Sequence, residues 1–176
     1  MSRSQCSSPG ATGISESKEK ELIKNGIAFR VIGRREDLSP KLQREIAALE
    51  EKTKDGEFTL VVALSYGGRD EIIRAAKIFN AEAQRRRERG ESVGDEAVFS
   101  SCLDTAGMPD PDLIVRTSGE LRISNFLLWQ AAYAEFYFTN VLWPDFDKAE
   151  FDKAIASFSK RERRLGGRKG EGEGEG

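Results

Sequence analysis

The sequence of 176 residues contains no histidine and only two cysteines, Cys6 and Cys102. Without an imidazole, the Ser-His-Asp triad, the Cys-His dyad and every zinc site that needs histidine are excluded. Two cysteines form no disulfide framework, which fits a reducing compartment. Any acid, base or metal ligand must therefore be a carboxylate, a hydroxyl, an amine or a thiol.

Long apolar runs and a large excess of charge are also absent. No segment approaches the roughly 20 apolar residues of a transmembrane helix, and the N-terminus lacks the apolar stretch of a signal peptide. Lys and Arg total 28 against 30 Asp and Glu, a net charge of −2. No overall basic field therefore predicts nucleic-acid binding. These absences predict a cytoplasmic protein without a transmembrane segment.

The two ends of the chain are poor in large apolar side chains. Residues 1–16 are rich in small and polar side chains, and residues 168–176 end in alternating Gly and Glu. Such compositions bury little apolar surface, so we expect a disordered N-terminus and a flexible C-terminal tail. Residues 17–167 are expected to form one domain.

Between these ends, apolar strands alternate with amphipathic helices. Strands are predicted at 27–32, 58–64, 113–116 and 136–142. Helices are predicted after Ser39-Pro40, after the Gly67-Gly68 pair, at 95–103, at 125–134 and near the C-terminus. Their buried faces are expected to hold Leu42, Ile46 and Leu49, then Ile72, Ala76, Phe79 and Ala83, and finally Phe151, Ile155 and Phe158. The alternation predicts an α/β fold with a mostly parallel β-sheet flanked by helices on both faces.

The second strand runs into Ser65-Tyr66-Gly67-Gly68-Arg69, a turn with paired glycines before a helix. Ligands of open α/β sheets bind beyond the carboxyl ends of the strands, and amides at a helix N-terminus favour an anion. The alternative is a tight turn with a solvated Arg69.

The ten residues that begin with Arg116 hold two guanidinium groups and three hydroxyls. A guanidinium presents a planar fork of donors that matches phosphate oxygens, and Ser124 is expected to cap the following helix. Arg116, Arg122 and Ser124 therefore suit a diphosphate. The alternative is a polar loop whose arginines pair with Glu120 and Asp112.

Glu135 stands between an apolar helix and an aromatic strand. A buried carboxylate is costly unless it is paired, so Glu135 is expected to pair with an arginine or to help hold a metal. Residues 160–169 carry six basic side chains against one acidic one. This run fits a solvated helix end, a nucleic-acid patch or a clamp for a diphosphate.

Several segments together match one known pattern. They are Tyr66-Gly67-Gly68-Arg69 with Glu71-Ile72, and residues 111–120, 122–130, 132–135, 142–146 and 161–167. These segments resemble the cis-prenyltransferases, the undecaprenyl (polyprenyl) diphosphate synthase family. The resemblance covers about residues 17–167, and it is highly specific between Pro111 and Phe146.

The resemblance implies a transferase that condenses isopentenyl diphosphate with an allylic prenyl diphosphate in cis, with Mg²⁺ as cofactor. It also implies a parallel sheet flanked by helices. The residues that it implies for substrate binding are Arg69, Arg116, Arg122, Ser124, Arg164 and Gly166. Glu135 is implied for Mg²⁺. Arg164-Leu165-Gly166 resembles a C-terminal motif that reaches the active site across an interface, which implies a homodimer or a heterodimer with a complete homologue. The lipid product implies peripheral membrane contact.

The sequence also departs from the family. The opening segment Met-Asp-Gly-Asn-Gly-Arg-Trp-Ala, whose Asp holds Mg²⁺, has no counterpart here, and neither does the later Ser-x-x-x-Asn motif. Ser65 stands where the family usually has Asn. We therefore expect a truncated domain that lacks the family's N-terminal strands and leaves apolar sheet edge exposed.

No catalytic residue is expected to remain, so the chain is expected to be inactive alone. Two alternatives stay open. The chain is either a non-catalytic partner subunit of a complete cis-prenyltransferase or a truncated gene product.

Overall fold

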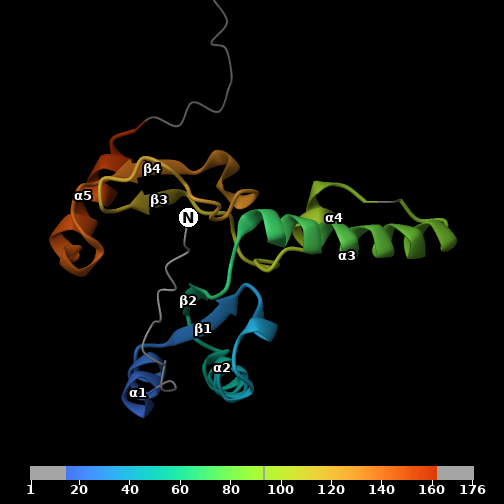
Figure 1. The fold of residues 1–176 in the computed structure, drawn as a ribbon, viewed down its shortest axis with the longest axis horizontal. Coiled ribbons are helices and arrows are strands. Elements are labelled where there is room, and N and C mark those ends of the chain that lie inside the picture. The colour runs from blue at the N-terminus through green and yellow to red at the C-terminus, as the bar shows by residue number, and fades with distance from the viewer. Residues whose placement is uncertain (1–14, 93, 162–176) are drawn as a thin grey trace, which may run out of the picture. The chain divides into compact units, whose positions relative to one another are not determined.

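The computed structural model describes residues 15–92 and 94–161 (Figure 1). The elements are α1 (Glu16–Lys24), β1 (Ile27–Ile32), η1 (Arg35–Asp37), α2 (Pro40–Thr53), β2 (Phe58–Ala63), α3 (Gly68–Glu88), α4 (Glu96–Ser100), β3 (Leu113–Arg116), η2 (Gln130–Tyr133), β4 (Glu135–Phe138), η3 (Trp143–Asp145) and α5 (Lys148–Ser159). They belong to two compact units. Of the described residues, unit 1 holds 15–92, 94–108 and Asn125–Trp129, and unit 2 holds Pro109–Ser124 and 130–161.

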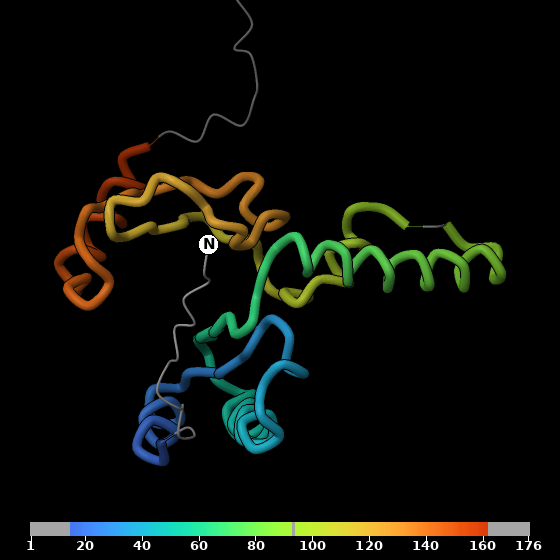
Figure 2. Tube along the Cα trace, in the orientation of Figure 1, coloured from blue at the N-terminus to red at the C-terminus, as the bar shows by residue number. Residues whose placement is uncertain are grey.

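Unit 1 is built on β1 and β2, which pair in parallel from Ile27↔Phe58 to Ile32↔Ala63. Helices α1 and α2 pack against β1 (Figures 1 and 2). As predicted, α2 begins at Pro40 behind an N-cap serine, whose Oγ accepts the Leu42 N–H at 3.3 Å. Its buried face includes Ile46 and Leu49, which agrees with the expected stripe.

The two edges of this sheet differ. At the outer edge of β1, the Phe29 N–H donates to Thr53 Oγ1 at 3.0 Å and the Val31 N–H donates to Glu50 Oε1 at 2.9 Å. Side chains of α2 therefore close that edge. Among the described residues β2 has no strand neighbour other than β1, and its Phe58 and Leu60 are 64% and 45% exposed. That missing strands leave an apolar sheet edge exposed stays a prediction.

Helix α3 buries part of the predicted stripe. Ala83 is buried as predicted, whereas Ala76 is exposed and Glu71 and Ala75 are buried instead. Glu71 was not expected because a hydrophobic pattern does not assign a carboxylate to the core. Helix α4 packs against α3 and is shorter than the predicted 95–103. The long α3 and the segment that returns to it are seen in Figure 2.

Unit 2 is built on β3 and β4, which pair in parallel from Leu113↔Glu135 to Arg116↔Phe138. Helix α5 packs against β4 and buries Ala154 completely. Two residues of its predicted buried face, Phe151 and Ile155, are instead exposed. The fully buried position of α5 is therefore a small alanine rather than one of these larger apolar side chains.

The α/β class with parallel strands and flanking helices is confirmed. Within the described residues the strands pair in parallel two by two, β1 with β2 in unit 1 and β3 with β4 in unit 2. Helix α1 begins at Glu16, the last residue of the predicted disordered N-terminus, and it was not predicted. The predicted tail 168–176 lies outside the described residues.

The helix predicted at 125–134 is wrong. Ser124, Asn125 and Leu127 have φ angles of 50°, 64° and 46°, in the left-handed region that an α-helix of L-residues does not use. Only the short η2 forms in this stretch. Ser124 therefore does not cap a helix.

Candidate functional site

The turn between β2 and α3 lies at the carboxyl end of the first sheet. Its N-cap residue, Gly67, has no side chain, so the first amides of α3 need other acceptors. Asn125 supplies them, since its backbone oxygen accepts the Gly68 N–H at 2.7 Å and its Oδ1 accepts the Arg69 N–H at 2.9 Å. These two amides are therefore already bonded within unit 1 and are not free for an anion.

The paired glycines are explained by the closeness of this capping segment. A Cβ on Gly67 would lie 2.8 Å from Asn125 Nδ2, and a Cβ on Gly68 would lie 2.8 Å from Leu128 Cγ. Neither glycine has a positive φ, so space rather than backbone freedom requires them. Any side chain here would displace the segment that caps α3.

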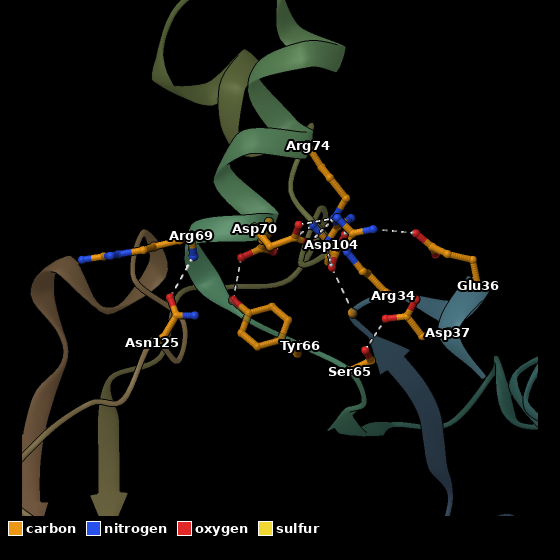
Figure 3. A network of polar contacts seen from close by, with 12 residues as sticks. Arg34, Glu36, Asp37, Ser65, Tyr66, Arg69, Asp70, Arg74, Asp104 and Asn125 are labelled. Carbon is orange, nitrogen blue, oxygen red and sulfur yellow. Dashed lines mark hydrogen bonds and ion pairs between the residues drawn. The ribbon is translucent and has the colours of Figure 1, made fainter. Parts of the chain in front are cut away.

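Two arginines and two aspartates form an ion-pair network beside the turn (Figure 3). Arg34 Nε donates to Asp70 Oδ2 at 2.9 Å, and Arg74 Nε donates to the same oxygen at 3.0 Å. Arg74 also binds both carboxylate oxygens of Asp104 at 2.7 Å. The Gly33 N–H donates to Asp104 at 3.0 Å. The loop that follows β1 and the loop that follows α4 are therefore both tied to α3.

A buried carboxylate lies at the centre of this region. Glu71 is 1% exposed, and its Oε2 accepts the hydroxyl of Tyr66 at 2.6 Å. Its Oε1 accepts the Asp104 N–H at 3.0 Å. Burial, followed by the hydrogen bond and charge of Glu71, raises the pKa of the Tyr66 hydroxyl far above its usual range. Tyr66 is therefore a neutral donor.

Arg69 differs from the other arginines at this turn. Its side chain is exposed and extends away from the ion-pair network (Figure 3). Its guanidinium forms no hydrogen bond or ion pair with residues 15–92 or 94–161. Unit 1 thus presents one free guanidinium on a turn that is held by hydrogen bonds.

In unit 2, Arg116 ends β3 and its Nε is buried without a hydrogen-bond partner among the described residues. Arg122 is 70% exposed, and its Nη2 lies 2.6 Å from Glu120 Oε2. Arg122 and Glu120 thus form one of the ion pairs that we expect if this segment is only a polar loop. Ser124 is exposed and offers its hydroxyl without helix amides beside it.

The loop that follows β3 is fixed by the chain that follows β4. The Ser118 N–H donates to the Val141 oxygen at 2.8 Å and the Gly119 N–H donates to the Thr139 oxygen at 2.9 Å. These bonds replace strand pairing, so β4 ends at Phe138 rather than at the predicted residue 142. They also anchor the loop from which Arg122 projects.

Glu135 pairs with an arginine, as one of its two predicted roles requires. Its Oε2 lies 3.2 Å from Arg161 Nη1, which also donates to the Phe136 oxygen at 3.0 Å. In the part of the chain that the structure describes, no group of three or more His, Cys, Asp or Glu side chains is placed to hold a metal. The Glu135 carboxylate is bound to an arginine instead, and Mg²⁺ held by a single carboxylate would need water and substrate phosphate oxygens as its other ligands. Arg164 and Gly166 lie outside the described residues.

The family model described as "Putative undecaprenyl diphosphate synthase" matches residues 10–166. The chain belongs to the undecaprenyl diphosphate synthase family. The family that the sequence motifs predicted is thereby confirmed.

Curated members of this family are close in sequence. An isoprenyl transferase of Fusobacterium nucleatum is 50% identical, over 86% of this chain and 63% of its own length. A ditrans,polycis-undecaprenyl-diphosphate synthase of Legionella pneumophila, named as specific for (2E,6E)-farnesyl diphosphate, is 46% identical over 83% of this chain and 61% of its own length. The chain spans about three fifths of the length of these relatives.

Two solved structures agree with the fold. A probable undecaprenyl diphosphate synthase from Campylobacter jejuni has a TM-score of 0.70 and 37% identity, over 86% of this chain and 68% of that one. Lavandulyl diphosphate synthase from Lavandula x intermedia was solved with dimethylallyl diphosphate. It has a TM-score of 0.77 and 37% identity, over 86% of this chain and 66% of that one. None of the helices in the described ranges is long and apolar enough to cross a membrane.

Proposed function

We propose that this chain takes part in the cis condensation of isopentenyl diphosphate with an allylic prenyl diphosphate, and that unit 2 binds isopentenyl diphosphate. Membership of the undecaprenyl diphosphate synthase family supports the reaction class. In this proposal Arg116, Arg122 and Ser124 bind the diphosphate.

The observation that carries the proposal is the unpartnered Nε of Arg116. Buried polar groups are almost always hydrogen-bonded, because an unmade bond leaves the cost of desolvation uncompensated. A diphosphate oxygen is an acceptor of the right charge for this donor. Arg122, on the anchored loop in the same unit, adds a second guanidinium once it exchanges Glu120 for the ligand.

The allylic substrate is proposed by analogy with the relatives. The Legionella pneumophila synthase is named as specific for farnesyl diphosphate, and the lavandulyl diphosphate synthase was solved with dimethylallyl diphosphate. We propose a short allylic prenyl diphosphate of this kind for the assembly in which this chain works. Mg²⁺, a dimeric partner and peripheral membrane contact stay predictions from the resemblance.

The environment of Glu135, the residue predicted to hold Mg²⁺, supports a second role for the chain. Glu135 is bound to Arg161, and the described residues offer no cluster of acids for Mg²⁺. We therefore propose that the chain alone does not catalyse the condensation. A non-catalytic subunit that supplies Arg164-Leu165-Gly166 to a complete cis-prenyltransferase is the alternative that this observation favours.

Titration with isopentenyl diphosphate tests the binding site. Charge-assisted hydrogen bonds contribute about 1.5–3 kcal/mol each, so Arg116→Ala is expected to weaken binding about tenfold or more. Arg116→Lys restores little, because an ammonium has no counterpart of Nε in the planar fork. The matched control is Arg44→Ala, which removes an exposed arginine of α2 in unit 1 and leaves the affinity unchanged. Equal affinities of wild type and Arg116→Ala contradict the proposal.

A further inference from the structure

The buried carboxylate of Glu71 has no role in the diphosphate site of unit 2. A charge that is 1% exposed is costly to keep, because desolvation opposes its ionised form. Glu71 has hydrogen bonds from the Tyr66 hydroxyl at 2.6 Å and from the Asp104 N–H at 3.0 Å. The segments that these two hydrogen bonds hold in place therefore indicate why a carboxylate is buried at position 71.

The bond from Tyr66 acts on the turn that leads to Arg69, and the bond from Asp104 ties the loop after α4 to the same carboxylate. Tyr66 is the residue before the paired glycines, and Glu71 lies in the first turn of α3, so their bond spans the turn from one side to the other. The Tyr66 ring is held in addition by an edge contact with Phe126, with centroids 5.8 Å apart. The hydroxyl of Tyr66 thus has a fixed direction toward the carboxylate.

The opposite side of the turn is held by the capping segment. Asn125 accepts the Arg69 N–H at 2.9 Å, so the backbone of Arg69 is fixed while its guanidinium stays free (Figure 3). Asp104, which donates its N–H to Glu71, is itself fixed by two bonds from Arg74 at 2.7 Å. The charges of this network are paired with one another, and Arg69 is left as the cation directed away from it.

We propose that Glu71 and Tyr66 are positioning residues, which hold the turn so that the guanidinium of Arg69 binds a phosphate or diphosphate anion. The inference rests on the proposed function for the class of ligand. The benefit of the arrangement is a fixed backbone: because the turn that carries Arg69 is ordered before binding, only the side-chain torsions of Arg69 lose freedom when the anion arrives.

A double-mutant cycle tests this with inorganic pyrophosphate as the probe, titrated by calorimetry. Arg69→Ala is expected to weaken binding about tenfold, the loss of a charge-assisted hydrogen bond. Tyr66→Phe keeps the ring and removes the hydroxyl, and we expect it to weaken binding about threefold to tenfold. The double variant is expected to bind no more weakly than Arg69→Ala, since Tyr66 acts only through Arg69.

A matched control separates positioning from stability. Thr53→Val removes another buried hydroxyl of unit 1, which accepts the Phe29 N–H at 3.0 Å at the edge of β1. It is expected to lower the unfolding temperature, as Tyr66→Phe does, and to leave pyrophosphate affinity unchanged. Hydrogen exchange at the Gly68 and Arg69 amides is expected to accelerate in Tyr66→Phe and to stay at the wild-type rate in Thr53→Val.

The inference is overturned if the losses of pyrophosphate affinity in the two single variants add up in the double variant. It is also overturned if hydrogen exchange at the Gly68 and Arg69 amides is unchanged in Tyr66→Phe. Two patterns distinguish it from the proposed function. If binding of isopentenyl diphosphate depends on Arg116 while pyrophosphate affinity is independent of Arg69 and Tyr66, the inference fails and the proposed function stands. If affinity depends on Arg69 and Tyr66 but not on Arg116, the positioning role stands and the site proposed in unit 2 fails.

Discussion

Asp70 is the residue on which two arginines of unit 1 converge. Hydrogen bonds from Arg34 first, and then from Arg74, lower the pKa of its carboxyl to about 2. A carboxyl whose pKa is lower in the folded than in the unfolded state stabilises the fold above the unfolded pKa of about 4. That contribution is lost as the pH falls through the folded value.

We therefore expect the unfolding temperature to fall between about pH 4 and pH 2 through a contribution of Asp70. In Asp70→Asn this contribution is absent, so the variant is less stable at neutral pH and loses less stability on acidification. Thermal unfolding followed by circular dichroism over this range measures both slopes. Asp152→Asn, in an exposed pair with Lys148 on α5, is the matched control and is expected to follow wild type. Parallel acid curves for wild type and Asp70→Asn would contradict the assignment.

Among the elements, α3 depends on a segment distant in sequence for its N-terminal cap. Asn125 supplies two acceptors to its first amides, and the paired glycines leave room for it. The turn at Gly68 is therefore governed by packing rather than by helix propensity. These two influences predict opposite effects for a substitution by alanine.

On propensity alone, alanine in a helix is favoured over glycine by about 1 kcal/mol. A Cβ on Gly68, however, would lie 2.8 Å from Leu128 Cγ and 3.1 Å from the Leu128 backbone nitrogen. We expect Gly68→Ala to lower the free energy of unfolding by about 1–3 kcal/mol, the usual cost of overpacking. Chemical denaturation measures the change. A stabilised Gly68→Ala would show that the segment moves away without cost.

Strand β2 is the element whose exposure has a direct physical consequence. One edge of the sheet is closed by side chains of α2, whereas β2 lacks a second strand among the described residues and exposes Phe58 and Leu60. An open apolar edge is a template for pairing with another chain. Self-association or binding of a partner strand is the expected behaviour.

We expect the purified chain to self-associate with rising concentration, and Leu60→Lys to reduce this, because an inserted charge blunts an open edge. Ile73→Lys, at a similarly exposed apolar position of α3, is the matched control and is expected to have a smaller effect. Light scattering across a concentration series compares the three proteins. A wild type that stays monomeric throughout would contradict the role of the β2 edge.

For the whole molecule, the matched family and the local chemistry lead to different expectations about activity. The family match extends over residues 10–166, yet the described residues lack an acid cluster for Mg²⁺. Departure of an allylic diphosphate needs its developing charge to be neutralised. The residues proposed to bind the diphosphate, Arg116, Arg122 and Ser124, include no carboxylate that could hold Mg²⁺ for this neutralisation.

We therefore expect no Mg²⁺-dependent condensation of farnesyl and isopentenyl diphosphates by the purified chain alone. The assay measures incorporation of labelled isopentenyl diphosphate, with a complete relative as the positive control. Turnover above the background without enzyme, abolished by a chelator, would sink this prediction. Enhanced turnover when the chain is added to the complete relative would support the role of a partner subunit.

Local patterns in the sequence were sufficient for several elements and for the family. The bounds of β1 and β3 and the start of α2 follow from apolar runs and from Ser39-Pro40, which act within a few residues. The family motifs are continuous segments, so they too are visible in one dimension. The pairing of Glu135 with an arginine was one of the two predicted roles, because a carboxylate beside apolar strands needs a cation.

Only the tertiary structure determined which residues form hydrogen bonds between distant parts of the chain. Glu71 reads as an ordinary polar residue of a helix, and only its spacing with Gly68 and Ala75 signals that it lies on the buried stripe. Asn125 takes a positive φ and caps α3 because acceptors are missing at Gly67, 58 positions earlier in the chain. Likewise, the closed edge of β1 and the division of the strands into two pairs depend on hydrogen bonds between distant segments. Such bonds leave no periodic trace in the sequence, since each depends on where the rest of the chain has folded.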